Sequence, residues 1–186
     1  MKLAWGKKLK PAEIRKVIEV SEYLGCEPSH LMACMAFESG RTFSPSIRNA
    51  AGSGAVGLIQ FMPQTALILG TSTDELAAMD FIEQMDYVLE YFVNRRNKLK
   101  TLADIYMAIL WPVAVGKPSD YVLFRADDPK YPKRYMQNRG LDFNKDGVVT
   151  KAECAAKVEA MLAMGLTDQY AYTITNDDLM LGDGTI

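Results

Sequence analysis

The sequence predicts a mostly α fold, and three observations support this prediction. Apolar residues recur at helical spacing in several segments of the chain. Proline and cap-forming residues precede these segments, and glycines follow several of them. β-Prone residues gather only in short pieces of one loop-rich segment. With 186 residues, of which 49% are hydrophobic and 24% charged, the chain is long enough for one main lobe with a hydrophobic core.

The first two predicted helices have clear start and stop signals. Pro11 is suited to the first turn of a helix, and Gly25 is a typical C-terminal stop. For the second helix we expect Ser29 as the N-cap and Gly40 as the stop. This assignment places Glu38 in the last turn of the second helix.

An irregular segment and two short helices follow. Residues 41–60 are too rich in Gly, Ser, Pro and Asn for a helix, so we expect an irregular lip or a small hairpin. Residues 63–69 predict a short helix, and Ser72 with Glu75 forms a capping box that begins another.

Three longer segments complete the prediction. Residues 81–99 carry a broad apolar stripe and predict a central buried helix. Thr101 caps a helix that runs through Leu110, and residues 151–164 are rich in helix-forming residues. From Thr167 onward no period is visible, so we expect a C-terminal tail that forms a surface arm or a disordered end.

Composition excludes several classes of function. A net charge of -2 gives no cationic field, so nucleic acid is not an expected partner. The single histidine and the three scattered cysteines do not have the spacing of a zinc site. No stretch is long and apolar enough for a membrane span, and no signal peptide is visible at the N-terminus.

Residues 142–153 have the spacing of an EF-hand calcium loop. Gly147 stands at the sharp turn, and Thr150 is expected to act through water. The alternative is a polar turn before a helix. Because the helix that enters the loop is short, we expect a structural Ca²⁺ clip rather than a sensor, with five ligands: Asp142, Asn144, Asp146, the carbonyl of Val148, and Glu153.

Three ordered blocks of residues form a further pattern. They are Glu38-Ser39-Gly40, the run GAVGLIQFMP at 54–63 with Thr-Ala at 65–66, and Tyr106. In these blocks, over roughly residues 10–115, the chain resembles the soluble-type lytic transglycosylases and, more distantly, goose-type lysozymes. The third block departs from the usual Ala-Tyr-Asn of the family, because it keeps the tyrosine and lacks the asparagine.

The resemblance implies a role for each matching residue. Glu38 would be the catalytic acid/base, Ser39 would support it, and Tyr106 would lie near the scissile sugar. Gly57 and Gln60 would belong to the glycan-binding lip. The substrate implied is the β-1,4 bond between N-acetylmuramic acid and N-acetylglucosamine in peptidoglycan, and catalysis would need no cofactor.

The resemblance also implies an architecture and a setting. We expect a lysozyme-like lobe over residues 10–125 with a small irregular lip, an EF-hand-like loop and helix over 126–166, and a tail over 167–186. Phage endolysins and virion lysins similarly pair this lobe with an EF-hand-like loop. A chain of this kind would be made in the host cytoplasm, act on the cell wall, and, if carried on the virion, have other virion proteins as partners.

The residues around Glu38 suit an acid with a raised pKa. Apolar neighbours, among them Met35 and Phe37, disfavour its charged form. No acidic residue occurs between Glu38 and Asp74, which favours a mechanism with a single carboxylate in which the sugar's N-acetyl group attacks the anomeric carbon.

The expected product of this mechanism is a 1,6-anhydro sugar, formed by intramolecular attack of the 6-hydroxyl. Lysozyme-type hydrolysis is the alternative, with Asp74, Asp80 or Asp86 positioning the water. A second alternative is a catalytically inactive, glycan-binding virion protein.

Overall fold

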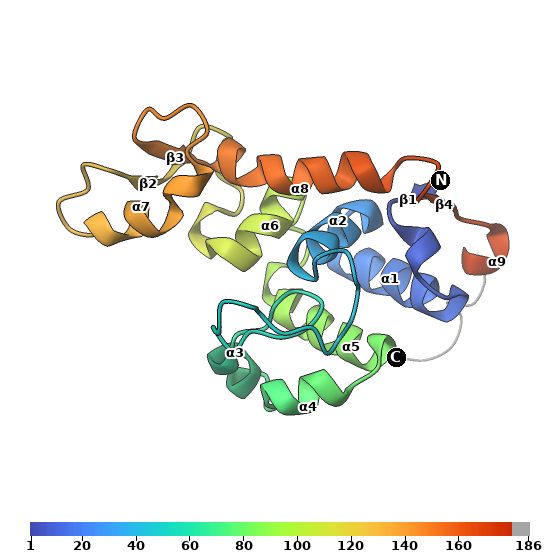
Figure 1. Ribbon diagram of the computed structural model, residues 1–186. Coiled ribbons are helices and arrows are strands. Elements are labelled where there is room, and N and C mark those ends of the chain that lie inside the picture. Colours follow the sequence, from blue (N-terminus) through green and yellow to red (C-terminus); the bar gives the residue numbers. More distant parts are fainter. Residues whose placement is uncertain (180–186) are drawn as a thin grey trace.

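α-Helices form most of the structure, a computed structural model that describes residues 1–179 (Figure 1). The helices are α1 (Pro11–Leu24), α2 (Pro28–Glu38), α3 (Pro63–Ile68), α4 (Thr73–Ala78), α5 (Phe81–Phe92), α6 (Leu102–Leu110), α7 (Pro132–Asn138), α8 (Lys151–Gly165) and α9 (Asn176–Leu179). The strands are β1 (Lys2–Leu3), β2 (Val122–Arg125), β3 (Val148–Thr150) and β4 (Tyr172–Thr173). This composition confirms the predicted mostly α fold.

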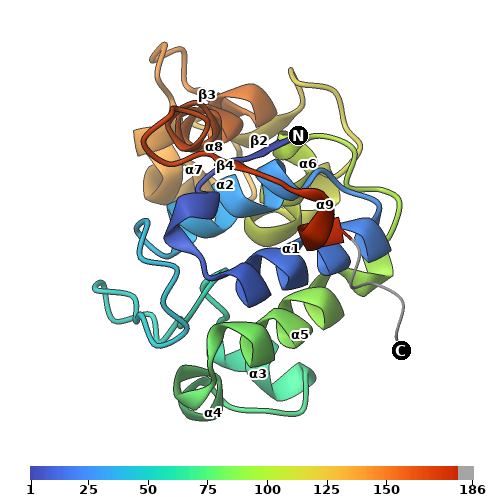
Figure 2. The ribbon, with the colours of Figure 1, turned by 90° about the vertical axis from the view of Figure 1, so that its right-hand side faces the viewer.

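Helix α8 runs along one side of the molecule and joins its two ends (Figure 1). It packs on α2 and α6, while α1 packs between α2 and α5. Figure 2 looks along α8 and shows α8, α2, α1 and α5 stacked in layers. Apolar residues from all these helices form one continuous core, so α2 lies in the middle of the packed lobe.

Helix α8 joins two parts of the molecule, the helical lobe and the distal lobe. The helical lobe is residues 11–110, from α1 to α6, and the distal lobe is residues 111–150, with β2, α7 and β3. The distal lobe lies at the opposite end of the molecule from β1 and β4 (Figure 1). In the distal lobe β2 and β3 pair antiparallel, with Phe124 opposite Val149.

A buried ion pair joins the two lobes to α8. Lys151 Nζ lies 2.6 Å from Asp104 Oδ1, and both side chains are nearly inaccessible to solvent. Asp104 Oδ1 also accepts a hydrogen bond from the amide of Gly116, and Lys151 donates to the carbonyl of Lys117. A pocket of about 400 Å³ opens beside this pair. The start of α8 is thereby tied to α6 and to the loop that enters the distal lobe.

Most of the predicted helix boundaries are confirmed, and α2 is an exception. Helix α1 begins at Pro11 and ends before Gly25, which has a φ of +69°. Helix α2 begins at Pro28, one residue before the predicted cap. Ser29 is buried, and its hydroxyl accepts a hydrogen bond from the amide of Ala4 at 3.0 Å. The predicted cap was wrong because a tertiary contact uses the Ser29 hydroxyl.

Helix α5 is shorter than the helix predicted over residues 81–99. It ends at Phe92, and a 3₁₀ turn, Val93–Arg95, follows. The amide of Asn97 then donates to the carbonyl of Leu24, and the Arg96 guanidinium lies over the Tyr23 ring. These contacts with the end of α1 turn the chain away from the helix axis.

The segment after Thr167 is also more regular than predicted. Strand β4 pairs with β1, with Tyr172 opposite Leu3. The amide of Ile174 donates to the carbonyl of Met1, and α9 follows. This segment is ordered because it pairs with the N-terminal strand, and its own sequence has no hydrophobic period that would predict a strand. The rest of the predicted tail, residues 180–186, lies outside the described residues.

Within residues 1–179, none of the helices combines the length and the apolar character that crossing a membrane requires.

Candidate active site

Glu38 ends a helix that is almost entirely buried. Residues 31–36 of α2 are inaccessible to solvent, because α2 is covered by α8, α6 and α1. Glu38 is the last residue of this helix and is only partly exposed. The fold therefore presents one carboxyl group at the edge of an apolar core.

The environment of Glu38 favours its protonated form. Burial raises the pKa of Glu38 to about 7. Among the described residues, no side chain forms an ion pair or a hydrogen bond with its carboxyl group. A carboxyl group with this pKa can hold a proton at neutral pH and transfer it to a bound ligand.

Two tyrosines lie close to Glu38. Tyr106 of α6 is buried, and its ring meets the ring of Phe37 edge to face at 5.6 Å. Burial and the charge of Glu38 raise the pKa of both Tyr106 and Tyr91. The Tyr91 hydroxyl donates to the carbonyl of Ala108 at 2.8 Å, which ties α5 to α6. The Tyr106 hydroxyl has no hydrogen-bond partner among the described residues.

Ser39 organises the turn that follows Glu38. Its side chain is buried, and its hydroxyl donates to the carbonyl of Met35 at 2.6 Å. The same hydroxyl accepts a hydrogen bond from the amide of Phe43 at 3.0 Å. Both contacts are internal, so this hydroxyl holds the end of α2 and the start of the lip in place.

The lip, residues 41–62, is irregular as predicted, and its shape depends on Gly57. Two isolated bridges, Arg48 with Val56 and Val56 with Phe61, are its regular pairings. Gly57 has a φ of +83°, and a Cβ atom there would collide with the side-chain amide of Gln84. Gln60 Nε2 donates to the carbonyl of Gly57 at 3.2 Å. Gly57 and Gln60 therefore build the lip from within.

Gln84 of α5 is a residue that the sequence prediction missed. It is fully buried, and its Oε1 accepts a hydrogen bond from the amide of Leu58 at 2.8 Å. Its Nε2 donates to the carbonyls of Leu76 and Pro45. Its hydrogen bonds with Leu58 and Pro45 fix the lip to α5, and its hydrogen bond with Leu76 fixes α4 to α5. The signal available in the sequence was a glutamine three residues after Phe81 in an apolar stripe.

Tyr91 was missed for a different reason. The apolar stripe placed α5 in the core, and no sequence motif distinguished Tyr91 from the other aromatic residues of that helix. The tertiary structure brings it near Glu38, because α5 packs on α1 and the Tyr91 hydroxyl is hydrogen-bonded to α6.

The three aspartates considered as water-positioning groups are engaged elsewhere. Asp74 forms an exposed ion pair with Arg48 at 2.6 Å. Asp80 caps α5 by accepting from the amide of Glu83, and Asp86 forms an ion pair with Lys16 at 2.8 Å. The structure therefore brings Glu38 together with Tyr106 and the lip, and it commits these three carboxylates to other contacts.

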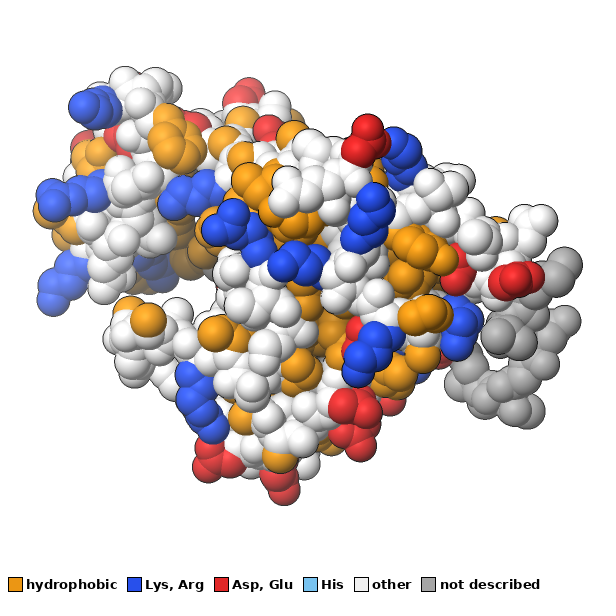
Figure 3. Space-filling view, turned by 45° about the vertical axis from the view of Figure 1, so that its right-hand side comes forward, with side chains coloured by type: hydrophobic (Ala, Val, Ile, Leu, Met, Phe, Trp, Pro, Cys, Tyr) orange, Lys and Arg blue, Asp and Glu red, His pale blue; other side chains and the backbone are white. Residues whose placement is uncertain are grey.

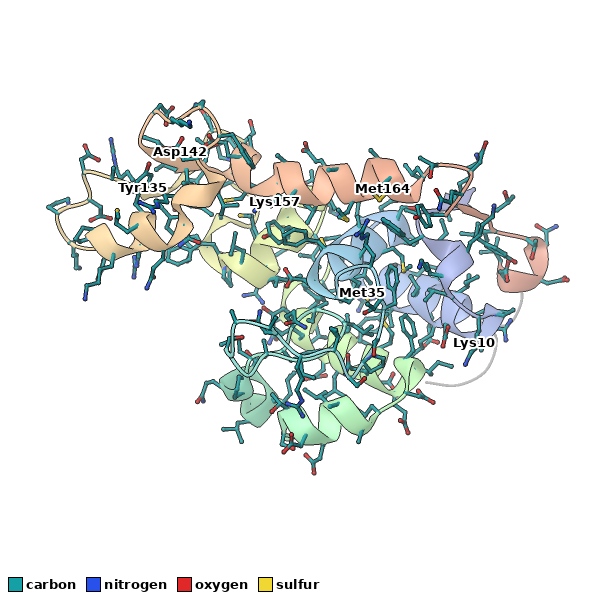
Figure 4. All side chains as sticks on the ribbon, in the orientation of Figure 1. Lys10, Met35, Tyr135, Asp142, Lys157 and Met164 are labelled. Carbon is teal, nitrogen blue, oxygen red and sulfur yellow. The ribbon has the colours of Figure 1, made fainter. Side chains whose placement is uncertain are left out.

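The predicted calcium loop is a tight turn that begins in the distal lobe. Asp142 accepts hydrogen bonds from the amides of Asp146 and Gly147 and from the hydroxyl of Tyr135, at 2.7 Å in the last case. The Tyr135 hydrogen bond and the backbone amides hold the pKa of Asp142 below its usual value. Figure 4 shows Asp142 and Tyr135 together at one end of the molecule, far from Met35 in α2.

The remaining predicted ligands follow the same turn. Asn144 Oδ1 accepts from the amide of Asp146, and Asp146 Oδ1 accepts from the amide of Val148. Glu153 Oε2 accepts from Thr150, while Glu153 Oε1 is buried without any hydrogen-bond partner. Within residues 1–179 no three His, Cys, Asp or Glu side chains converge as a metal site. The hard oxygen donors suit Ca²⁺, but their carboxylates are turned toward the backbone of the loop.

Comparison with known protein families places part of the chain in one of them. The family model described as the transglycosylase SLT domain matches residues 16–108, half of the chain. The match includes Glu38, the lip and Tyr106, and it stops before the distal lobe. No significant match was found among curated proteins.

Proposed function

This chain belongs to the transglycosylase SLT domain family, and on that premise we propose that it cleaves the β-1,4 bond between N-acetylmuramic acid and N-acetylglucosamine. Family membership assigns it an activity of the peptidoglycan lytic transglycosylase type. The choice of this bond and of the mechanism depends on Glu38. Burial raises the pKa of its carboxyl group to about 7, and no described side chain forms a hydrogen bond or an ion pair with it.

In the first step Glu38 is the general acid. It transfers its proton to the glycosidic oxygen as the bond to the anomeric carbon breaks. The carbonyl oxygen of the sugar's own acetamido group forms a bond to that carbon in the same step. The leaving sugar departs with a neutral hydroxyl group, and Glu38 becomes a carboxylate.

In the second step Glu38 is the general base. The carboxylate accepts the proton of the 6-hydroxyl as the oxygen of that group attacks the anomeric carbon and displaces the acetamido oxygen. The product is a 1,6-anhydro sugar, and Glu38 is protonated again. Tyr106, with its free hydroxyl near Glu38, is the residue we assign to orienting the sugar.

The intramolecular route is favoured because hydrolysis needs a second group that positions a water molecule. Asp74, Asp80 and Asp86 are engaged in an ion pair, a helix cap and another ion pair. The 6-hydroxyl is already tethered to the reacting sugar, so it has the advantage of an intramolecular nucleophile.

Digestion of purified peptidoglycan, followed by mass analysis of the fragments, tests the proposal. We expect muropeptides that end in 1,6-anhydro-N-acetylmuramic acid and are lighter by one water than hydrolysed fragments. Reducing-end muramic acid would instead assign lysozyme-type hydrolysis. Binding without any cleavage would assign the inactive glycan-binding alternative. The phage setting that the resemblance implies stays a prediction.

We also infer that residues 142–153 hold a structural Ca²⁺ ion. The observation in favour is Glu153 Oε1, a buried carboxylate oxygen with no partner. Asp142, Asn144, Asp146 and the carbonyl of Val148 would supply the other oxygen ligands. The bound ion would join the loop to the first turn of α8 and would take no part in catalysis.

A further inference from the structure

An arginine of the distal lobe lies between two aromatic rings. The guanidinium of Arg134, in α7, is 3.7 Å from the centroid of the Tyr131 ring and 5.2 Å from that of Trp111. Trp111 is itself fixed by the ring of Phe124, which it meets at 5.1 Å. Such stacking restrains a planar guanidinium by its faces and leaves its edges available.

The edges of this guanidinium have no hydrogen-bond or ion-pair partner in the part of the chain that the structure describes. Within residues 1–179, Arg134 forms no side-chain hydrogen bond and no ion pair. The preceding loop has two acidic residues. Asp127 pairs with Arg125, while Asp128 accepts from the amides of Lys130 and Tyr131 and senses the charge of Arg134 without forming an ion pair with it. Arg134 is only partly exposed, so the stack is a rigid group of hydrogen-bond donors rather than a freely moving surface charge.

The stack is connected to the helix that carries Tyr106. Trp111 directly follows α6 and is five residues after Tyr106, a rise of about 7.5 Å along a helix. Figure 3 shows the surface hollowed between the distal lobe and the lip, with Lys and Arg side chains gathered on the distal lobe. A glycan strand that extends from Glu38 and Tyr106 along this hollow would pass beside the distal lobe, which carries the stack.

We propose that Arg134, held between Trp111 and Tyr131, is a subsite that binds a carboxylate of the peptide stems attached to the glycan. This inference rests on the proposed function, because it takes peptidoglycan as the ligand. The sugars of a stem-bearing strand are uncharged, since the lactyl carboxyl group is joined to the peptide, and the free carboxylates belong to the stems. A planar guanidinium matches a carboxylate with two parallel hydrogen bonds.

Binding measurements with a turnover-free protein test this subsite. In the Glu38→Gln background, we compare Arg134→Gln with Lys133→Gln, which removes an equal charge from an exposed neighbour on α7. The ligands are soluble glycan strands with their stems and the same strands after chemical coupling to methylamine has converted the stem carboxylates to neutral amides. We expect Arg134→Gln to weaken binding to the stem-bearing strands about tenfold or more. Lys133→Gln should change it little.

The strands with amidated stems separate carboxylate recognition from structure. Both variants should bind them as the parent protein does, and Arg134→Lys, which keeps the charge without the planar fork, should recover only part of the affinity for stem-bearing strands. An equal loss on both ligands, or no loss on either, would overturn the subsite. If the wild type cleaves peptidoglycan but Arg134→Gln does not weaken binding, the subsite is wrong and the proposed function stands. If the protein binds neither kind of strand, the proposed function is wrong as well.

Discussion

Glu38 and Asp142 are acidic residues of two different regions, and their surroundings act on their charges in opposite ways. Glu38 ends α2 without a hydrogen-bond partner, and burial raises its pKa to about 7. Asp142 accepts hydrogen bonds from Tyr135 and from backbone amides, which lower its pKa. The first arrangement keeps a proton available for transfer, and the second keeps a negative charge available for a cation.

The comparison teaches that hydrogen bonding, more than residue type, assigns the role of a carboxylate in this chain. In the helical lobe, Ser39 and Tyr91 use their hydroxyl groups in other contacts, and the carboxyl group of Glu38 has no hydrogen-bond partner among residues 1–179. Within residues 142–153, one carboxylate oxygen, Glu153 Oε1, is buried without a partner among the described residues. Substitutions at Glu38, at the ion pair between α6 and α8, and at the proposed calcium ligands test these two roles.

Replacing Glu38 gives the largest expected effect. Glu38→Gln keeps the shape of the side chain but cannot donate the proton, so we expect the rate of peptidoglycan cleavage to fall at least 100-fold, because general acid catalysis contributes about 10²- to 10⁴-fold. The rate of release of soluble muropeptides measures it. Glu22→Gln, at an exposed position of α1, is the matched control and should be fully active.

The pH dependence gives a second measurement on the same residue. For wild type, kcat/KM should be level below pH 7 and decline above it, because the protonated form of Glu38 is then lost. A raised folded-state pKa also means that stability declines as pH rises through about 7. The Glu38→Gln variant should therefore melt at the same or a higher temperature than wild type at pH 8. If Glu38→Gln kept a tenth of the wild-type cleavage rate, a group other than Glu38 would be the general acid.

Breaking the ion pair between α6 and α8 tests whether the two regions depend on each other. Lys151→Met leaves Asp104 buried with its charge uncompensated, and we expect a loss of about 3–5 kcal/mol in the free energy of unfolding. Urea titration measures it. Adding Asp104→Asn should restore part of the loss by removing the charge.

Lys157→Met, also on α8, is the matched control for this pair and should change stability little. If Lys151→Met unfolds at the same urea concentration as wild type, the pair does not hold the two lobes together.

Calcium gives the smallest of the three effects. An ion that binds only the folded protein stabilises it by about 2.7 kcal/mol when its concentration is about 100 times Kd. We expect millimolar Ca²⁺ to raise the melting temperature of chelator-treated protein. Glu153→Gln should remove this rise while keeping the helix cap, since glutamine also forms a capping box.

Asp120→Asn, an exposed aspartate outside the loop, should keep the full calcium response. Identical melting of the wild type with and without Ca²⁺ would show that residues 142–153 are an ordinary turn. In that case Asp142 would serve only to shape the loop.

Much of the fold was predictable because its signals are local. Helix starts at Pro11, Ser72 and Thr101 were correctly assigned from cap chemistry that acts within one turn of the chain. The predictions were wrong where a polar group or a strand interacts with a segment that is distant in the sequence. Ser29 binds the N-terminal segment instead of capping α2, and β4 is ordered by pairing with β1.

Three features could be predicted from the sequence: the mostly helical fold, the place of Glu38 at the end of a helix, and the oxygen donors of residues 142–153 at calcium-loop spacing. These features depend on neighbours within a few residues. Only the tertiary structure decided which carboxylate stays unpartnered, that Gln84 and Tyr91 support the site, and that Arg134 meets Trp111. Burial and hydrogen bonding between distant segments set these properties, because they depend on which surfaces the fold brings together.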